Sequence, residues 1–165
     1  NLDDPERRLR TSGTIQPPAK IGSNAKIVDS LISPGARIEG TVIRSVISPG
    51  VIIEPGAEVR DSVIQHRCVI RAGAVVDRSI LDKEVIVGRN AVIGEGDNNQ
   101  PNFERPDIVN AGISIVGKRV VIPEGLHVGR NVVIGPGVAD ELIDRGHLES
   151  GASVHPTQMP LHLFV

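Results

Sequence analysis

The side chains that could take part in catalysis are one cysteine and five histidines. Cys68 follows His66 by two residues, and a thiol or an imidazole can serve as a nucleophile or a general base. The other histidines are His127, His147, His155 and His162. No two of the five show the paired His spacing that is typical of a zinc site. We therefore expect no metal and no catalysis from these groups, and we predict that Cys68 is an inert core residue.

The composition excludes several classes of protein. Hydrophobic residues make up 39% of the chain, but there are only two Phe and no Trp or Tyr, so the core must be aliphatic. The 18 Gly and 12 Pro indicate many turns, and Ile and Val favour strands. A net charge of −2 and the lack of aromatic stacking groups argue against nucleic acid. No apolar run is long enough for a membrane span, and a single cysteine is typical of the reducing cytoplasm.

A six-residue repeat runs through most of the chain. Aliphatic residues recur at steps of six, six and five from Ile47 to Ile93, which gives a period of 17, and at steps of six from Val116 to Ile134. Small or β-branched residues usually take the fifth position of the repeat. Gly or Asn takes the fourth position, at Asn24, Gly35, Gly50, Gly56, Gly73, Asn90, Gly125 and Asn131. Gly and Asn tolerate a left-handed backbone, so we predict a corner there.

Three short walls with a corner after each make a triangular prism, that is, an all-β parallel solenoid of about six coils. A sandwich of alternating strands and turns is the alternative. The phrase Val-Gly-Arg-Asn occurs at 87–90 and again at 128–131. In both copies we expect the Val in the core, the Gly against the wall, the Arg in solvent and the Asn at the corner.

A second regularity lies at the five-residue steps. Charged residues stand there at Asp29, Arg44, Asp61, Arg78 and Glu95, and a serine follows each of the first four. Stacking would align them as a column of alternating sign. We interpret this column as structural, because it would fix the register of the coils, although exposed ion pairs contribute only about 0–1 kcal/mol each.

Four segments are expected. Residues 1–20 are polar and contain Pro, which is typical of a linker, and residues 21–138 form the β-helix. Residues 97–112 interrupt the repeat, and an inserted loop of this size is more often functional or interfacial than accidental. Residues 139–165 leave the repeat and are predicted to form a C-terminal tail that caps one open end.

Several phrases carry a resemblance to a known family. "TIQPPAKIG", "SVISPGVIIEPGAEVRDSVI", "RAGAVVDRSILDKEVIVGRNAVIG" and the stretch from "PNFERPDIV" to "GRNVVIG" resemble the C-terminal part of glucose-1-phosphate adenylyltransferase, also called ADP-glucose pyrophosphorylase. The resemblance covers roughly residues 14–138. The hexapeptide repeat also resembles the left-handed β-helix proteins, and this likeness, not the period, predicts left-handed coils.

The family makes ADP-glucose from ATP and glucose 1-phosphate with Mg²⁺, in the synthesis of glycogen or starch. Its catalysis belongs to an N-terminal nucleotidyltransferase domain with a "GxGxRL"-type loop, and no such loop occurs in these 165 residues. The resemblance thus implies an oligomerisation and regulatory domain that is inactive alone. It implies no cofactor in this chain, with Mg²⁺ and ATP bound only by the catalytic domain. The expected partners are further copies of the chain, that catalytic domain and an anionic sugar-phosphate effector.

The resemblance also points to candidate effector residues. Lys83 lies in "ILDKEVIVG", similar to the family's "IxDKNxxIG", and Lys118 lies in "ISIVGKRVVIPEG", similar to "xVVxKNAxIxDG". Glu84 and Arg119 replace the Asn of these motifs, so Glu84 would oppose an anion and Arg119 would assist it. Arg105, in the inserted loop, is a weaker candidate. Because the lysines flank the insertion, they could converge, although both could also be ordinary surface charges.

Two other functions stay open at this point. One is a free-standing hexapeptide-repeat acyltransferase that uses coenzyme A and needs a catalytic His. The other is the solenoid of a related sugar-nucleotide enzyme, such as a mannose-1-phosphate guanylyltransferase.

Overall fold

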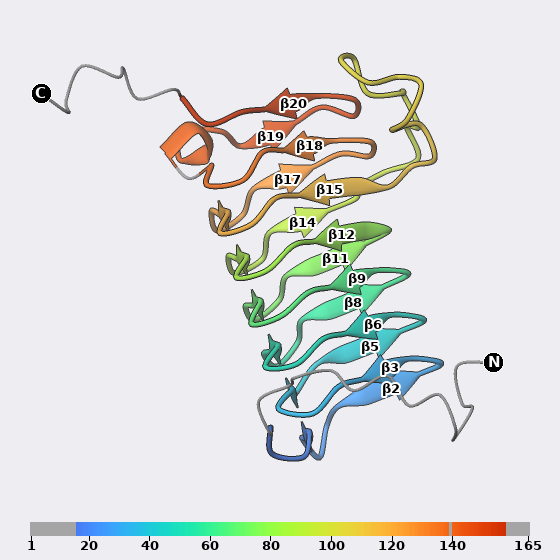
Figure 1. Cartoon of the computed structure of the whole chain (residues 1–165), viewed down its shortest axis with the longest axis vertical. Helices are drawn as coiled ribbons and strands as arrows, with labels where there is room; N and C mark the ends of the chain where they lie inside the picture. The colour runs from blue at the N-terminus through green and yellow to red at the C-terminus, as the bar shows by residue number, and fades with distance from the viewer. Residues whose placement is uncertain (1–15, 139, 158–165) are drawn as a thin grey trace, which may run out of the picture.

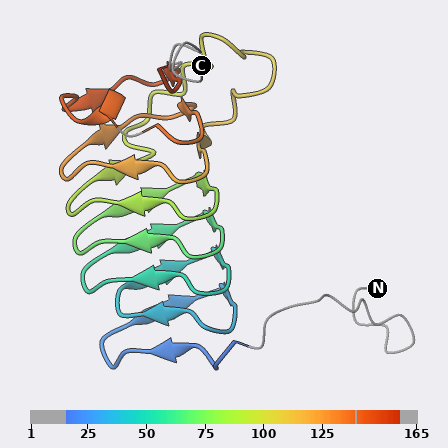
Figure 2. The ribbon, with the colours of Figure 1, turned by 60° about the vertical axis from the view of Figure 1, so that its left-hand side comes forward.

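The chain winds as a left-handed parallel β-helix (Figures 1 and 2), seen in a computed structural model that describes residues 16–138 and 140–157. Three parallel sheets form the walls of the prism. Sheet A contains β1 (Lys20–Ile21), β4 (Arg37–Ile38), β7 (Ile52–Ile53), β10 (Val69–Ile70), β13 (Ile86–Val87) and β16 (Val121–Ile122). Sheet B contains β2 (Lys26–Val28), β5 (Thr41–Ile43), β8 (Glu58–Arg60), β11 (Val75–Asp77), β14 (Val92–Ile93), β17 (His127–Val128) and β19 (His147–Leu148). Sheet C contains β3 (Leu31–Ile32), β6 (Val46–Ile47), β9 (Val63–Ile64), β12 (Ser79–Leu81), β15 (Ser114–Val116), β18 (Val133–Ile134) and β20 (Ser153–Val154).

The core is a stack of aliphatic columns, one behind each wall. In sheet A, Ile53 pairs with Ile70, which pairs with Val87, and all three side chains are fully buried. The corners contribute smaller columns, such as Ala57, Ala74 and Ala91 between sheets A and B. The predicted all-β left-handed solenoid is therefore confirmed.

Every position at which the repeat predicts a corner lies in a turn. The backbone is left-handed, with positive φ, at Gly35, Gly50, Gly56, Gly73, Asn90, Gly125 and Asn131. Asn24 in the first coil also lies in a turn, which the N–H of Ala25 closes by donating to the carbonyl of Gly22 at 3.1 Å, but its φ is not positive.

The two Val-Gly-Arg-Asn phrases occupy different corners. Gly88 is needed because a Cβ there would lie 2.6 Å from the backbone N of Glu124 in the next coil. Arg89 is exposed, as expected, but Arg130 is buried with only 6% of its surface accessible. The prediction that both arginines point to solvent is wrong for Arg130, because the insertion covers it and its Nε donates to the carbonyl of Gly96.

The register column consists mainly of its serines. Ser45, Ser62 and Ser79 are buried, and each Oγ donates to the carbonyl two residues before it. The Oγ atoms of Ser45 and Ser62 also accept the backbone N–H of the next serine in the column, at 3.0–3.1 Å. Arg44 and Asp61 form an ion pair at 2.6 Å, the only pair between charged members of the column in the described part of the chain. Buried hydrogen bonds thus hold the register more than the exposed charges do.

The solenoid continues past residue 138, where we predict its end. β19 pairs with β17 and β20 with β18, so residues 147–154 add two walls of a seventh coil instead of forming a separate cap. The repeat conceals this coil because the spacing widens, although Leu148 and Val154 still point inward. A short 3₁₀ helix, η2 (Asp140–Leu142), stands where a sheet A strand would be. Most of the predicted linker (residues 1–15) and the end of the tail (158–165) lie outside the described residues.

The insertion leaves the solenoid after β14 and returns at β15. It projects beside the last coils (yellow in Figure 1). Within the described ranges, no helix is long and apolar enough to span a membrane.

Replacing Ala91 by Phe is expected to destabilise the fold severely. The side chain at this corner is fully buried between stacked coils, and overpacking of this kind costs about 1–3 kcal/mol or more. We expect thermal unfolding followed by circular dichroism to show a melting temperature lower by about 10 °C. Arg89→Phe, at the exposed position of the same corner, is the matched control and should melt close to the original chain. An unchanged melting temperature for Ala91→Phe would show that the inward and outward assignments are wrong.

Candidate functional site

The two candidate lysines lie one above the other at the corner that joins sheet C to sheet A. Lys83 follows β12, and Lys118 follows β15 in the next coil. The register of β13 on β16, Ile86 opposite Val121, brings these corners together across the insertion. The backbone N–H of Arg119 donates to the carbonyl of Lys83 at 3.0 Å. The Lys83 side chain is exposed and that of Lys118 is half-buried. The two lysines therefore stand at equivalent corners of adjacent coils.

A ladder of ion pairs runs beside the lysines through three coils. Arg67 Nη2 contacts Glu84 Oε1 at 2.5 Å, and Arg119 Nε contacts Glu84 Oε2 at 3.0 Å. The two guanidinium groups lower the pKa of the Glu84 carboxyl to about 2. Glu84 therefore pairs with Arg119, which we had expected to be free for an anion. The cations without an acidic partner here are Lys83 and Lys118, among the described residues.

The ladder occupies a strained backbone position. Arg67, Glu84 and Arg119 have φ of 57°, 63° and 61°. The same corner carries Pro-Gly in the coils before and after, at 34–35, 49–50 and 136–137, and the central coils have His66-Arg67, Lys83-Glu84 and Lys118-Arg119. A non-glycine residue in the left-handed region costs roughly 1–2 kcal/mol. Charged side chains thus replace the residues best suited to this turn, over a continuous stretch.

Arg105 does not join this group. It lies in the insertion, which leaves from the corner between sheets B and C, a different edge of the prism. Its backbone N–H donates to Asn102 Oδ1 at 2.9 Å. The missed member of the site is Arg67, and the 17-residue period could have found it, since Arg67 lies 17 residues before Glu84.

Cys68 lies in the core, as predicted. Its side chain is fully buried, and burial raises the pKa of the thiol to about 11. The thiol donates to the carbonyl of Asp82 at 2.9 Å. A protonated, enclosed thiol is not a nucleophile at neutral pH.

Two of the four histidines in the described part of the chain, His127 and His155, pair with glutamates. His127 Nδ1 lies 2.7 Å from Glu95 Oε2, and His155 Nε2 lies 2.8 Å from Glu104 Oε2. No group of three His, Cys, Asp or Glu side chains within residues 16–138 and 140–157 could hold a metal ion. His162 lies outside those ranges.

Comparison with known proteins gives related sequences and a related fold. Two glucose-1-phosphate adenylyltransferases match nearly the whole chain. The protein from Acetivibrio thermocellus is 36% identical over 93% of this chain and 36% of its own length, and that from Thermomicrobium roseum is 48% identical over 94% and 37%. The chain therefore spans little more than a third of these relatives.

Among solved structures, the acetyltransferase domain of PglB from Neisseria gonorrhoeae matches with a TM-score of 0.53 and 19% identity, over 86% of this chain and 56% of that one. This likeness shows the fold alone. The profile of the GlmU-like, C-terminal hexapeptide family matches residues 17–116. Together with its adenylyltransferase relatives, this match places the chain in the GlmU-like C-terminal hexapeptide family.

Proposed function

We propose that the chain is the oligomerisation and allosteric-regulatory domain of a glucose-1-phosphate adenylyltransferase. An N-terminal nucleotidyltransferase domain would be its partner and would bind ATP and Mg²⁺, since the 165 residues contain no loop of the "GxGxRL" type. The relatives support this function because the matched region is only 36–37% of their length. We also propose a cytoplasmic location, in keeping with a single, buried and unpaired cysteine.

The observation that carries the regulatory proposal is the basic corner, which we define as Arg67, Lys83, Glu84, Lys118 and Arg119. An anionic sugar phosphate needs cations, and an ammonium is an effective point-charge partner for a phosphate. Lys83 and Lys118 provide two such groups in adjacent coils. The positive φ values of Arg67 and Arg119 cost backbone energy, and strain of this kind is typical of functional positions, which supports a binding role for this corner.

Glu84 has a distinct role in this proposal. Its carboxylate holds Arg67 and Arg119 in place, and it lowers the net positive charge that an anion would meet. The net positive charge of the basic corner is therefore reduced, which suits an effector that must bind and also dissociate.

The outer face of sheet C supports the assembly proposal. Each of its first six strands presents one aliphatic side chain outward, and we call this row the aliphatic stripe: Leu31, Val46, Val63, Ile80, Ile115 and Val133. Leu31 is 71% exposed, and Ile80 and Ile115 are 38% and 36% exposed. The outward side chains of sheet B are mixed, since Lys26, Glu58 and His127 stand in one row with Val75 and Val92. A continuous apolar row on one wall is typical of an interaction surface.

Lys83→Ala and Lys118→Ala are each expected to weaken effector binding by about tenfold, because each removes a cation from the phosphate. The measurement is thermal stabilisation by fructose 1,6-bisphosphate and by 3-phosphoglycerate, with coenzyme A in parallel. Lys26→Ala, on the exposed face of sheet B, is the matched control and should behave like the original chain. Equal affinity in the lysine variants would remove both residues from the site, and stabilisation by coenzyme A alone would favour an acyltransferase.

Glu84→Gln is expected to raise the affinity for the same anions about two- to fivefold, because it frees Arg67 and Arg119. The carboxyl pKa of about 2 keeps Glu84 charged throughout the neutral range, and its charge is lost only as the pH falls through that value. The difference between variant and original should therefore be constant from about pH 7 to pH 9 in titration calorimetry, where Glu84 and the phosphate groups of the effector keep their full charge. A difference that disappears within this range would contradict the ion ladder.

Ile80→Lys is expected to shift the chain toward the monomer without unfolding it, because it places a charge in the middle of the aliphatic stripe. Light scattering coupled to size exclusion would measure the mass across a range of concentrations. Thr41→Lys on sheet B is the control and should leave the mass unchanged. A chain that is monomeric at every concentration would overturn self-association through the solenoid.

A further inference from the structure

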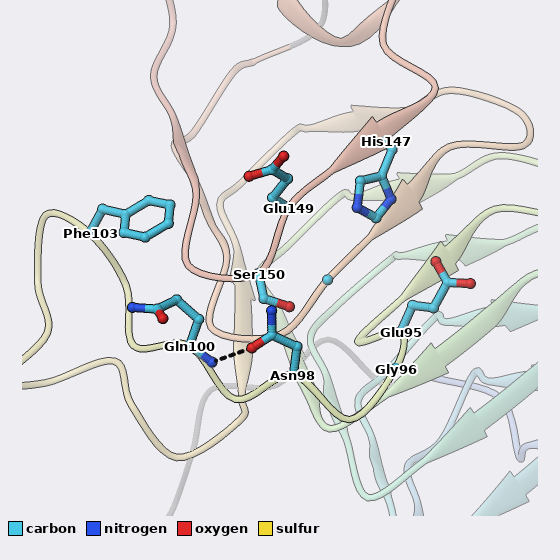
Figure 3. Close-up of a pocket in the computed structure, with 9 residues that line it drawn as sticks. Glu95, Gly96, Asn98, Gln100, Phe103, His147, Glu149 and Ser150 are labelled. Carbon is cyan, nitrogen blue, oxygen red and sulfur yellow. Dashed lines mark hydrogen bonds between the residues drawn. The ribbon is translucent and has the colours of Figure 1, made fainter.

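A cavity of about 620 Å³ lies between the insertion and the last coil. It sits at the corner between sheets B and C, away from the basic corner between sheets C and A. Glu95, Gln100, Phe103, His147 and Glu149 are among the residues that line it (Figure 3). The volume falls within the range of about 300–1,000 Å³ that is usual for small-molecule sites.

Two buried asparagines fix the insertion that forms one wall of the cavity. Asn102 and Asn131 are both fully buried. Asn102 Nδ2 donates to the carbonyls of Asn131 and Ala152 at 3.0 and 3.1 Å. Asn131 in turn accepts the N–H of Gly112 at 2.7 Å and donates to the carbonyl of Gln100 at 2.9 Å. Because these bonds satisfy both amides, the cavity is preformed and a ligand need not order the loop.

Further contacts hold the base and the side of the insertion. The pairs Glu95–His127 and Glu104–His155 tie it to β17 and to the residue after β20. The N–H of Phe103 donates to the carbonyl of Gly151 at 2.8 Å. This bond holds the backbone of Phe103, and so places its ring at the edge of the cavity.

The free groups in the cavity are a mixture of donors and acceptors. The side chains of Gln100, His147 and Glu149 have no hydrogen-bond or ion-pair partner among residues 16–138 and 140–157. Figure 3 shows His147 and Glu149 on the side of the last coil, across from Gln100 and Phe103 on the insertion. A carboxylate only accepts hydrogen bonds, whereas an amide and an imidazole can do both. A hydroxyl group, which is also donor and acceptor, matches such a set.

The same inventory argues against other ligands. The carboxylates of Glu95 and Glu149 would repel a phosphate, and the described residues offer no metal-binding group. A simple cation cannot accept hydrogen bonds, so the free donors of Gln100 and His147 would have no partner on it. Phe103 is 63% exposed and is the single Phe, Tyr or Trp in the described part of the chain. An exposed flat ring at the edge of a polar cavity can stack on the C–H face of a sugar ring.

We propose that this cavity binds a neutral polyhydroxy ligand of one or two hexose rings. The ligand stacks on Phe103, and its hydroxyl groups bond to Glu149, His147 and Gln100. This inference does not depend on the proposed effector site, which lies at another corner and takes anions.

The test uses the full chain with two neutral disaccharides as probes, maltose and cellobiose, measured by titration calorimetry and saturation-transfer NMR. We expect saturable binding of at least one disaccharide. Phe103→Ala and Glu149→Gln should each weaken it by about fivefold, which corresponds to one stacking contact or one hydrogen bond. Ile108→Ala is the matched control, because Ile108 is 60% exposed in the same insertion but does not line the cavity. It should bind like the original chain.

Three results would overturn the proposal. They are the absence of saturable binding for both sugars, binding that Phe103→Ala and Glu149→Gln leave unchanged, and binding of the cation agmatine in the absence of sugar binding. If the chain binds the anions but neither sugar, only the proposed sugar site is rejected. If it binds a sugar but no anion, only the proposed effector site is rejected.

Discussion

Each coil of this solenoid must place its inward aliphatic side chains directly over those of the coil before it, because the core is only as wide as one coil. Backbone hydrogen bonds between coils and the 17-residue spacing meet this requirement together, and the pairing of Ile53, Ile70 and Val87 shows it in sheet A. A shift by one residue would turn every aliphatic side chain outward. The buried serines at the corner between sheets B and C add hydrogen bonds that only the correct register allows.

This stacking also converts sequence distance into columns of side chains. Residues that share a position in the repeat become neighbours, so charges spaced at the period form a ladder without any special loop. The basic corner arises in this way, and so does the aliphatic stripe on sheet C. In such a fold, binding residues must lie at the corners and on the outer faces, because the inward positions are filled by packed core side chains.

The repeat was sufficient to predict the fold class, the inward residues and the corners at Gly and Asn from the sequence. It did not predict the left-handed backbone at charged corner residues such as Arg44, Asp61 and Glu84, because these residue types do not favour that conformation. The positions of Lys83 and Lys118 on either side of the insertion indicated that they could converge, and the structure stacks their two corners because the looped-out insertion does not disturb the register around it. The pairing of Glu84 with both arginines could not be predicted, since it depends on side-chain conformations at a strained corner. The burial of Arg130 and the anchoring role of Asn102 depend on how the insertion folds back, which no periodicity encodes. The seventh coil was missed because its spacing is irregular.

The insertion leaves the solenoid at one edge while the stacked lysines occupy another. Lys83 and Lys118 are 35 residues apart, although adjacent coils before the insertion are offset by 17, so 18 residues are looped out between them (35 − 17 = 18). The coils before and after the insertion keep their stacking, so the positions of the two lysines do not depend on the length of the loop. Evolution can therefore lengthen, shorten or exchange that loop as a separate module, and the two edges of the prism are free to diverge independently.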